Sequence, residues 1–235
     1  MNKLHLGLAA VLMAAGFAGG ADAATINNTA SGSVTVLPTN GGAGQVFGNL
    51  LLGDPGRANY LVFDLSSLAN QTIGSATLTI TAPGFYSSSD ASEHFALWDY
   101  SGNVSTLASY SFSNPPDAAT AAAVRTDLSS GLSYGSVDIA KPANGALPNI
   151  VVTLSADAIA NINSKLGSAS HLFAIGGSSD TLGTNQYLFQ TSGGGAGIAQ
   201  LDLQPVPLPA GIWLLVSGLM GLGAAARKRQ QAVAV

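Results

Sequence analysis

Residues 75–82 read Ser75-Ala76-Thr77-Leu78-Thr79-Ile80-Thr81-Ala82, a strict alternation of hydroxyl and apolar side chains. Successive side chains of a β-strand point to opposite faces, so this period predicts a strand with one buried face and one hydroxyl-lined face. In residues 60–65, Leu61, Phe63 and Leu65 alternate with Tyr60, Val62 and Asp64. Similar short runs occur at 33–36, 95–100, 104–110, 136–139, 150–154, 172–175, 187–190 and 199–203. Nine or ten short strands separated by Gly, Ser, Asn and Pro clusters predict an all-β sandwich.

Two helical inserts are expected between these strands. Asn114 can cap a helix that has Pro115 at its first position and runs through an alanine-rich stretch to Gly131. Ser155 can cap a second helix, which carries apolar residues at helical spacing and stops at Gly167. Both helices are short inserts, and strands and helices do not alternate as they do in βαβ units, so the predicted class remains all-β. The alternating runs place four residues in the core: Phe63, Leu78, Ile80 and Val152.

The composition excludes several classes of function. The 235 residues include no cysteine, which excludes disulfide scaffolds, cysteine-ligated metal centres and cysteine nucleophiles. The formal net charge is −4, and residues 24–205 hold only four bases against eleven acids. Nucleic-acid binding needs clustered Lys and Arg to neutralise phosphates, so no nucleic-acid partner is expected.

The N-terminus has the pattern of a secretory signal. Lys3 supplies a positive charge, a short apolar stretch follows, and Ala21-Asp22-Ala23 offers small residues for cleavage before Ala24. We therefore expect residues 1–23 to be a signal helix that is removed on export. The alternative is a buried N-terminal helix, although no amphipathic stripe is visible.

The C-terminus has the pattern of a membrane segment. Residues 210–226 carry no charge and end at a basic cluster, Arg227-Lys228-Arg229. Seventeen helical residues span roughly 25 Å, near the thickness of a bilayer core, and basic residues stay cytoplasmic. A transmembrane helix is predicted, with residues 24–205 outside the cytoplasm.

The same end resembles a known sorting signal. Val206-Pro207-Leu208-Pro209-Ala210, then the apolar stretch and the basic cluster, resemble the PEP-CTERM signal in its VPLPA form. The resemblance covers residues 206–229. It implies an inner-membrane precursor, cleavage by an exosortase-type protease, and delivery to the surface or extracellular matrix of a Gram-negative bacterium. Leu208 replaces the Glu of the parent motif, which implies a variant sorting enzyme, and a plain membrane anchor is the alternative.

The body between the signals also shows a resemblance. Residues 59–68 and 73–80, with the later order of helix, strand, aromatic strand and final strand, resemble exported jelly-roll domains of the DNRLRE and carbohydrate-binding type. The resemblance implies a jelly-roll-like fold for residues 24–205. The matching positions are core positions, so it implies nothing about a ligand.

No catalytic set emerges from the motifs. Residues 131–135, Gly-Leu-Ser-Tyr-Gly, have the letters of a nucleophile elbow around Ser133, but the following residues predict a strand where the elbow needs a helix. Asp90, Glu93 and His94 could offer ligands to a calcium or another metal ion, against the alternative of a solvated loop. We therefore expect no enzyme activity and no cofactor.

Aromatic residues are the candidates for sugar binding, because their faces stack on pyranose rings. Tyr86, in a Ser-rich loop, and Tyr100, before a Ser-Gly turn, are expected to be exposed. Trp98 is the third candidate, but it is expected to pack in the core, with an exposed aromatic face of its strand as the alternative. Three functions follow. The first is a structural or adhesive protein of the cell surface or matrix. The second is a carbohydrate-binding module for matrix polysaccharide, and the third is a glycoside hydrolase that uses two carboxylates.

Overall fold

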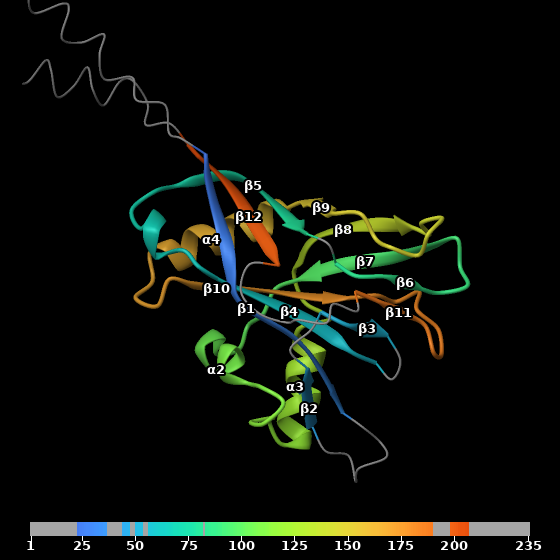
Figure 1. Cartoon of the computed structure of the whole chain (residues 1–235). Coiled ribbons are helices and arrows are strands. Elements are labelled where there is room, and N and C mark those ends of the chain that lie inside the picture. Colours follow the sequence, from blue (N-terminus) through green and yellow to red (C-terminus); the bar gives the residue numbers. More distant parts are fainter. Residues whose placement is uncertain are drawn as a thin grey trace, which may run out of the picture. The chain divides into compact units, whose positions relative to one another are not determined.

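The computed structural model describes residues 23–36, 44–47, 50–53, 56–81, 83–189 and 198–206 (Figure 1). Residues Ala23–Pro205 form one compact unit. Strands account for 46% of the structure and helices for 18%, so the expected all-β class is correct. The described part contains no helix that is both long and apolar enough to cross a membrane. Residues 1–22 of the expected signal peptide and 207–229 of the expected sorting signal lie outside the described residues.

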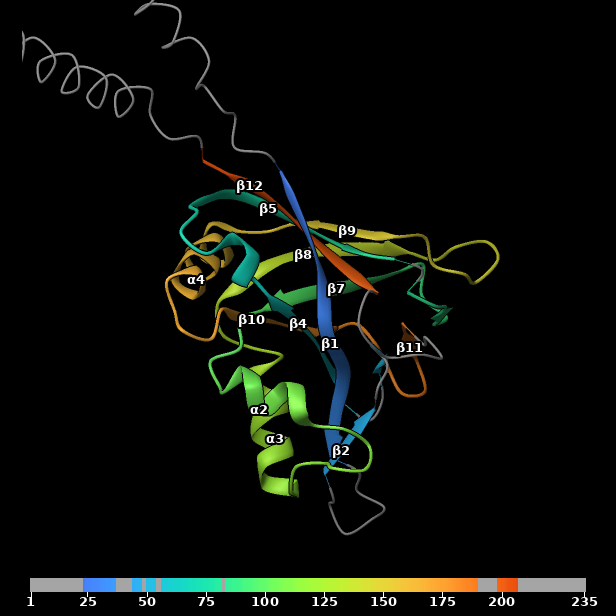
Figure 2. The same ribbon diagram turned by 60° about the vertical axis from the view of Figure 1, so that its left-hand side comes forward.

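Nine strands form one antiparallel sheet that curves until it almost closes (Figures 1 and 2). Their order is β8 (Ser133–Ala140), β7 (Ser92–Trp98), β10 (Leu172–Ser178), β4 (Ala58–Asp64), β1 (Ala24–Val36), β12 (Ala199–Pro205), β5 (Ile73–Ile80) and β9 (Ile150–Thr153), with β2 (Gly44–Phe47) paired to β1. A small second sheet joins β3 (Leu52–Gly53), β11 (Tyr187–Leu188) and β6 (Tyr86–Ser87).

The two edges of the large sheet meet at Ser155, two residues after the end of β9. Its backbone N–H donates to the Tyr134 carbonyl of β8 at 2.9 Å, and its hydroxyl donates to the Ser133 carbonyl at 2.7 Å. These two hydrogen bonds join β8 to the end of β9. The curvature of the sheet places its inner face around one hydrophobic core.

Strand β5 confirms the alternation read from residues 75–82. Ala76, Leu78 and Ile80 are buried, whereas Thr77 and Thr79 are partly exposed. The four residues predicted for the core are all buried: Phe63, Leu78, Ile80 and Val152.

Strand β4 is buried on both faces and separates two cores. Leu61 and Phe63 pack into the main core inside the curved sheet. Tyr60 and Val62 point the other way, into a second core that two helices cover, α2 (Val104–Ser109) and α3 (Ala118–Asp127). In Figure 2 both helices lie on the outer side of β1 and β4.

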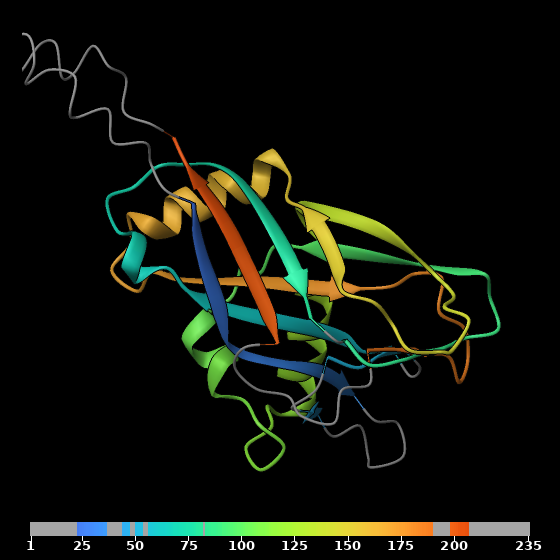
Figure 3. The ribbon, with the colours of Figure 1, turned by 45° about the horizontal axis from the view of Figure 1, so that its top comes forward.

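Helix α4 (Ala156–Leu166) is the helix predicted after Ser155 (Figure 3). The Ser155 hydroxyl accepts from the Ala158 N–H at 3.3 Å, and Gly167 is the C-cap. Ala158, Ile162 and Leu166 form one stripe that packs into the main core. The helix therefore covers one end of that core.

Two expectations about the elements are wrong. Residues 104–110 contain helix α2 instead of a strand, because Asn103 caps the Thr106 N–H at 2.9 Å and Val104 and Leu107 are buried at helical spacing. Helix α3 begins at Ala118 instead of Pro115. The second proline, Pro116, disfavours helical geometry at Pro115, whereas the Asp117 carboxylate caps the Thr120 N–H at 2.9 Å.

The structure has more short elements than expected. It contains twelve strands in the described residues instead of nine or ten, because β2, β3 and β6 were not predicted. A short 3-10 helix, Ser66–Leu68, follows β4. Helix α3 also ends earlier than expected, at Asp127 with Leu128 as its C-cap, instead of running to Gly131.

Candidate functional site

A groove of about 440 Å³ lies on the outer face of β7, β8 and β10. Phe95 and Leu97 of β7 point into the main core, so His94, Ala96 and Trp98 of the same strand point outward and line the groove. Pairing places Ala96 opposite Ser136 of β8 and Ser178 of β10. A small residue therefore lies at the centre of the floor, between two serines, with His94 and Trp98 along the strand on either side.

Trp98 is held in place by a hydrogen bond across the floor. Its Nε1–H donates to the Ser178 hydroxyl at 2.8 Å, and its side chain is half-buried. The expectation that Trp98 packs in the core is wrong, because the inward positions of β7 belong to Phe95 and Leu97. An indole of fixed orientation in an open groove is suited to contact with a ligand.

His94 forms an ion pair at the other end of the floor. Its Nδ1 lies 2.7 Å from Oδ1 of Asp138, the residue directly opposite on β8, and the side chains are 36% and 76% exposed. The carboxylate can only accept, so Nδ1 carries the hydrogen. The pair fixes the ring across β7 and β8.

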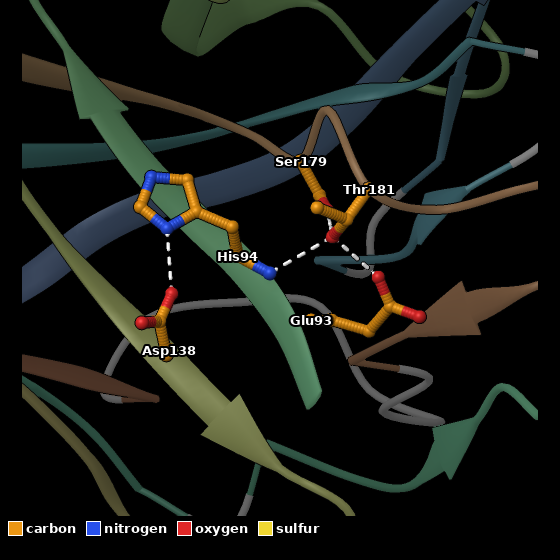
Figure 4. A network of polar contacts seen from close by, with 5 residues as sticks. All are labelled: Glu93, His94, Asp138, Ser179 and Thr181. Carbon is orange, nitrogen blue, oxygen red and sulfur yellow. Dashed lines mark hydrogen bonds and ion pairs between the residues drawn. The ribbon is translucent and has the colours of Figure 1, made fainter. Parts of the chain in front are cut away.

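Glu93 points to the opposite side of β7 from His94, as Figure 4 shows. Glu93 is only 1% exposed, and its carboxyl accepts hydrogen bonds from the hydroxyls of Ser88 and Thr181. The Thr181 hydroxyl also accepts from the His94 backbone N–H at 2.9 Å. This network joins the loop before β7 to the loop after β10.

The metal candidates do not converge. Glu93 and His94 lie on opposite faces of β7, and the Asp90 carboxylate accepts from the Gln186 amide at 3.2 Å. Among the residues that the structure describes, no three His, Cys, Asp or Glu side chains are grouped to hold a metal ion. Hydrogen bonds within the protein therefore account for the positions of the three candidate side chains, Asp90, Glu93 and His94.

Two arginines form one wall of the groove. Arg125 of α3 donates from Nη1 to the Gly56 carbonyl at 3.1 Å, and the guanidinium of Arg57, just before β4, lies 4.3 Å from the centre of the Phe47 ring. Burial lowers the pKa of Arg57 below its ordinary value, with a smaller opposing effect from Tyr187. The Nε atoms of both arginines are buried and have no hydrogen-bond partner among the described residues.

The other two aromatic candidates lie away from the groove. Tyr86 was expected to be exposed, and this is wrong: its ring packs in the main core, and its hydroxyl donates to the Asp90 carbonyl at 2.8 Å. Tyr100 is partly exposed and lines a second hollow beside Asp127. Burial, and secondarily the charge of Asp127, raise the pKa of Tyr100 to about 12.

Ser133 is not part of a nucleophile elbow. It is the first residue of β8, so the chain continues as a strand, as expected from the sequence. Gly131 and Gly135 on either side have φ angles of +112° and +134°, which glycine adopts far more readily than other residues. The backbone conformation therefore accounts for both glycines. Ser133 lines the groove together with His94.

The sequence pointed to Trp98 and His94 but not to Arg57 and Arg125. The arginines lie 68 residues apart and come from different elements, so no motif joins them. The one available signal was their rarity, because residues 24–205 contain only four bases. Neither a known protein family nor a curated protein sequence matches the chain.

Proposed function

We propose that this chain is an exported adhesive protein of the cell surface or extracellular matrix, and that its groove binds glycans. In this proposal residues 24–205 are a jelly-roll-like sandwich, and residues 206–229 are a sorting signal of the PEP-CTERM type. The observation that carries glycan binding is the outward-facing Trp98 with serine hydroxyls beside it in an open groove.

The chemistry of the groove suits a polyhydroxylated ligand. Ser136 and Ser178 can each donate and accept hydrogen bonds, and a sugar hydroxyl offers the same pair of functions. The apolar face of the Trp98 ring complements the C–H face of a pyranose. Most pockets for drug-like molecules are enclosed and apolar, whereas this groove is lined largely by polar side chains.

The test is a glycan array probed with the full-length chain and with Trp98→Ala. We expect at least one glycan to be retained, with about tenfold weaker binding by the variant, because a lost stacking contact is worth on the order of 1 kcal/mol or more. Phe85→Ala is the matched control, since Phe85 is 44% exposed and lies outside the groove. Equal binding by Trp98→Ala, or no glycan retained, would overturn the proposal.

The sorting proposal rests on the sequence of residues 206–229 and is tested separately. We expect Pro207→Ala with Pro209→Ala to leave the thermal stability of residues 24–205 unchanged, because both prolines follow the last strand. Membrane-bound precursor should accumulate in the native host. Normal release of the double variant would leave a plain membrane anchor as the explanation.

We further propose that the groove binds its ligand without turnover. Asp138 is paired with His94, which leaves Asp180 as the other carboxylate near the floor. Acid–base hydrolysis of a glycoside needs two carboxylates in complementary roles. Purified chain should leave ester, peptide and polysaccharide substrates intact. Hydrolysis that disappears in Asp180→Asn would support the glycoside hydrolase instead.

A further inference from the structure

The charges of the groove differ from those of the rest of residues 24–205. That segment has four bases and eleven acids, yet two of its four bases, Arg57 and Arg125, line the same groove. One acid, Asp180, lines it with them, and Asp138 is bound to His94. The groove is therefore locally basic on an acidic body.

Among the described residues, no carboxylate forms an ion pair with either arginine. The single ion pair in this part of the chain is His94–Asp138. Both guanidinium groups are partly buried, and a partly buried charge is normally paired because desolvation is costly. Two cations without a carboxylate partner among the described residues thus line the same groove.

Both guanidinium groups are also held in position. A Cβ atom on Gly56, whose φ is +51°, would lie 2.5 Å from Nη1 of Arg125, so Arg125 packs directly on the glycine backbone. The Phe47 ring supports Arg57 by a cation–π contact. A charge fixed before binding loses less entropy on binding, which favours specific recognition of an anion.

We propose that the groove takes an acidic glycan, a polymer of uronic acids, and that Arg57 and Arg125 bind its carboxylate while the sugar ring contacts Trp98. The inference rests on the proposed glycan binding and names its ligand class. A planar guanidinium can bind a carboxylate through two parallel hydrogen bonds, which a neutral sugar cannot reproduce. The overall negative charge of the body repels polyanions, so recognition depends on these two residues.

The test compares polygalacturonate with its methyl ester, in which the carboxyl groups carry no charge. For the full-length chain we expect at least tenfold tighter binding of the acid, measured by affinity electrophoresis or calorimetry. Arg57→Gln and Arg125→Gln should each weaken binding of the acid about tenfold and weaken binding of the ester much less. Trp98→Ala should weaken the binding of both polymers.

Three further variants make the test specific. Lys165→Gln removes a base of α4 that does not line the groove and should change nothing, whereas Asp180→Asn should strengthen binding of the acid. Arg125→Lys keeps the charge and should retain part of the affinity, which separates loss of charge from loss of fold. Melting curves for each variant identify any that is unfolded.

The outcomes separate this inference from glycan binding itself. Equal affinity for the acid and the ester, with dependence on Trp98, would overturn the acidic ligand and leave glycan binding intact. Binding of other glycans, with no binding of either polymer, would also overturn the acidic ligand and leave glycan binding intact. If no glycan binds the chain at all, both proposals are wrong.

Discussion

At the scale of single residues, Thr181 connects the groove to the interior. Its hydroxyl accepts from the backbone N–H of His94, a groove residue, and donates to the buried carboxyl of Glu93. A hydroxyl performs both roles at once, so an apolar side chain of the same shape cannot replace it. The position of His94 is therefore set by Asp138 on the outer face and by Thr181 through the backbone.

We expect Thr181→Val to lower the free energy of unfolding by about 1 kcal/mol, because the buried Glu93 carboxyl loses one of its two hydroxyl donors. Thr79→Val is the matched control: Thr79 lies on the half-exposed face of β5, and its replacement should cost less than about 0.5 kcal/mol. Urea denaturation measures both. Equal midpoints for the two variants would contradict the role given to Thr181.

Tyr60 makes stability depend on alkaline pH. Burial raises its pKa to about 12 in the folded protein, whereas an unfolded tyrosine ionises near pH 10. Its contribution is complete below about pH 10 and is lost as pH rises toward 12, because the unfolded chain releases the proton first. At pH 8 we expect Tyr60→Phe to have the same free energy of unfolding as the parent protein. Between pH 8 and pH 12 the variant should lose on the order of 2 kcal/mol less of this free energy than the parent does. Parallel curves of unfolding free energy against pH would refute this.

The sequence placed Trp98 among the candidates for sugar binding, because it is a large aromatic residue on an alternating strand, but the expected position of its side chain was the core. It could not decide which way Trp98 points, since either parity of residues 95–98 offers apolar side chains. The structure resolves this by burying Phe95 and Leu97. The wall of Arg57 and Arg125 depends on Arg125 of α3 reaching the Gly56 carbonyl, directly before Arg57, and such a long-range contact leaves no local pattern.

At the scale of elements, length decided which segments could be predicted. The eight residues of β5 allow one period only, so the strand was predicted correctly. In α2, six residues fit either alternation or the i, i+3 spacing of Val104 and Leu107, and the cap at Asn103 decides for the helix. The same ambiguity explains why the two-residue strands β3 and β6 were missed.

The contact of α3 with the sheet depends on a missing side chain in β10. A Cβ atom on Gly176 would lie 2.4 Å from the carbonyl oxygen of Leu128, the C-cap of α3, and backbone atoms cannot turn aside as a side chain can. We expect Gly176→Ala to cost about 1–3 kcal/mol in unfolding free energy. Denaturant titration measures the loss.

Gly167→Ala is the control for this prediction. Gly167 is the C-cap of α4 with φ −83°, and the nearest atom to an added Cβ is 3.7 Å away. The substitution should be neutral or stabilise the protein by about 0.5 kcal/mol through reduced freedom of the unfolded chain. If both glycine variants have the same stability, the close packing of α3 on Gly176 is not what stabilises that contact.

At the scale of the whole molecule, strand pairing is the part that the sequence could not predict. β1 pairs with β12 over residues 24–27, with β4 over 28–34 and with β2 over 33–36, with a bulge between Asn28 and Ala30. Alternation shows which face of a strand is buried but not which strand lies beside it. The almost closed sheet follows from these pairings.

We expect residues 24–205 to fold alone, because Ala23–Pro205 is a compact unit with its own core. The isolated segment should give a β-type circular dichroism spectrum and unfold in one cooperative transition. A mainly helical spectrum, or a gradual loss of signal on heating, would contradict this. The full-length chain in detergent is the reference for its melting temperature.

The pairing of β1 with β12 also determines how the body responds to mechanical load. Ala24 lies opposite Leu203 in this antiparallel ladder, so the two ends of the body leave it side by side. Tension applied across these ends loads the Ala24–Leu203 pair first and separates the residue pairs of β1 and β12 one after another. Tension between Pro205 and a ligand in the groove instead meets β12 held on both flanks, by four residue pairs with β1 and seven with β5. Several residue pairs then share the force, so the body should resist tension in this direction better than tension applied across its two ends.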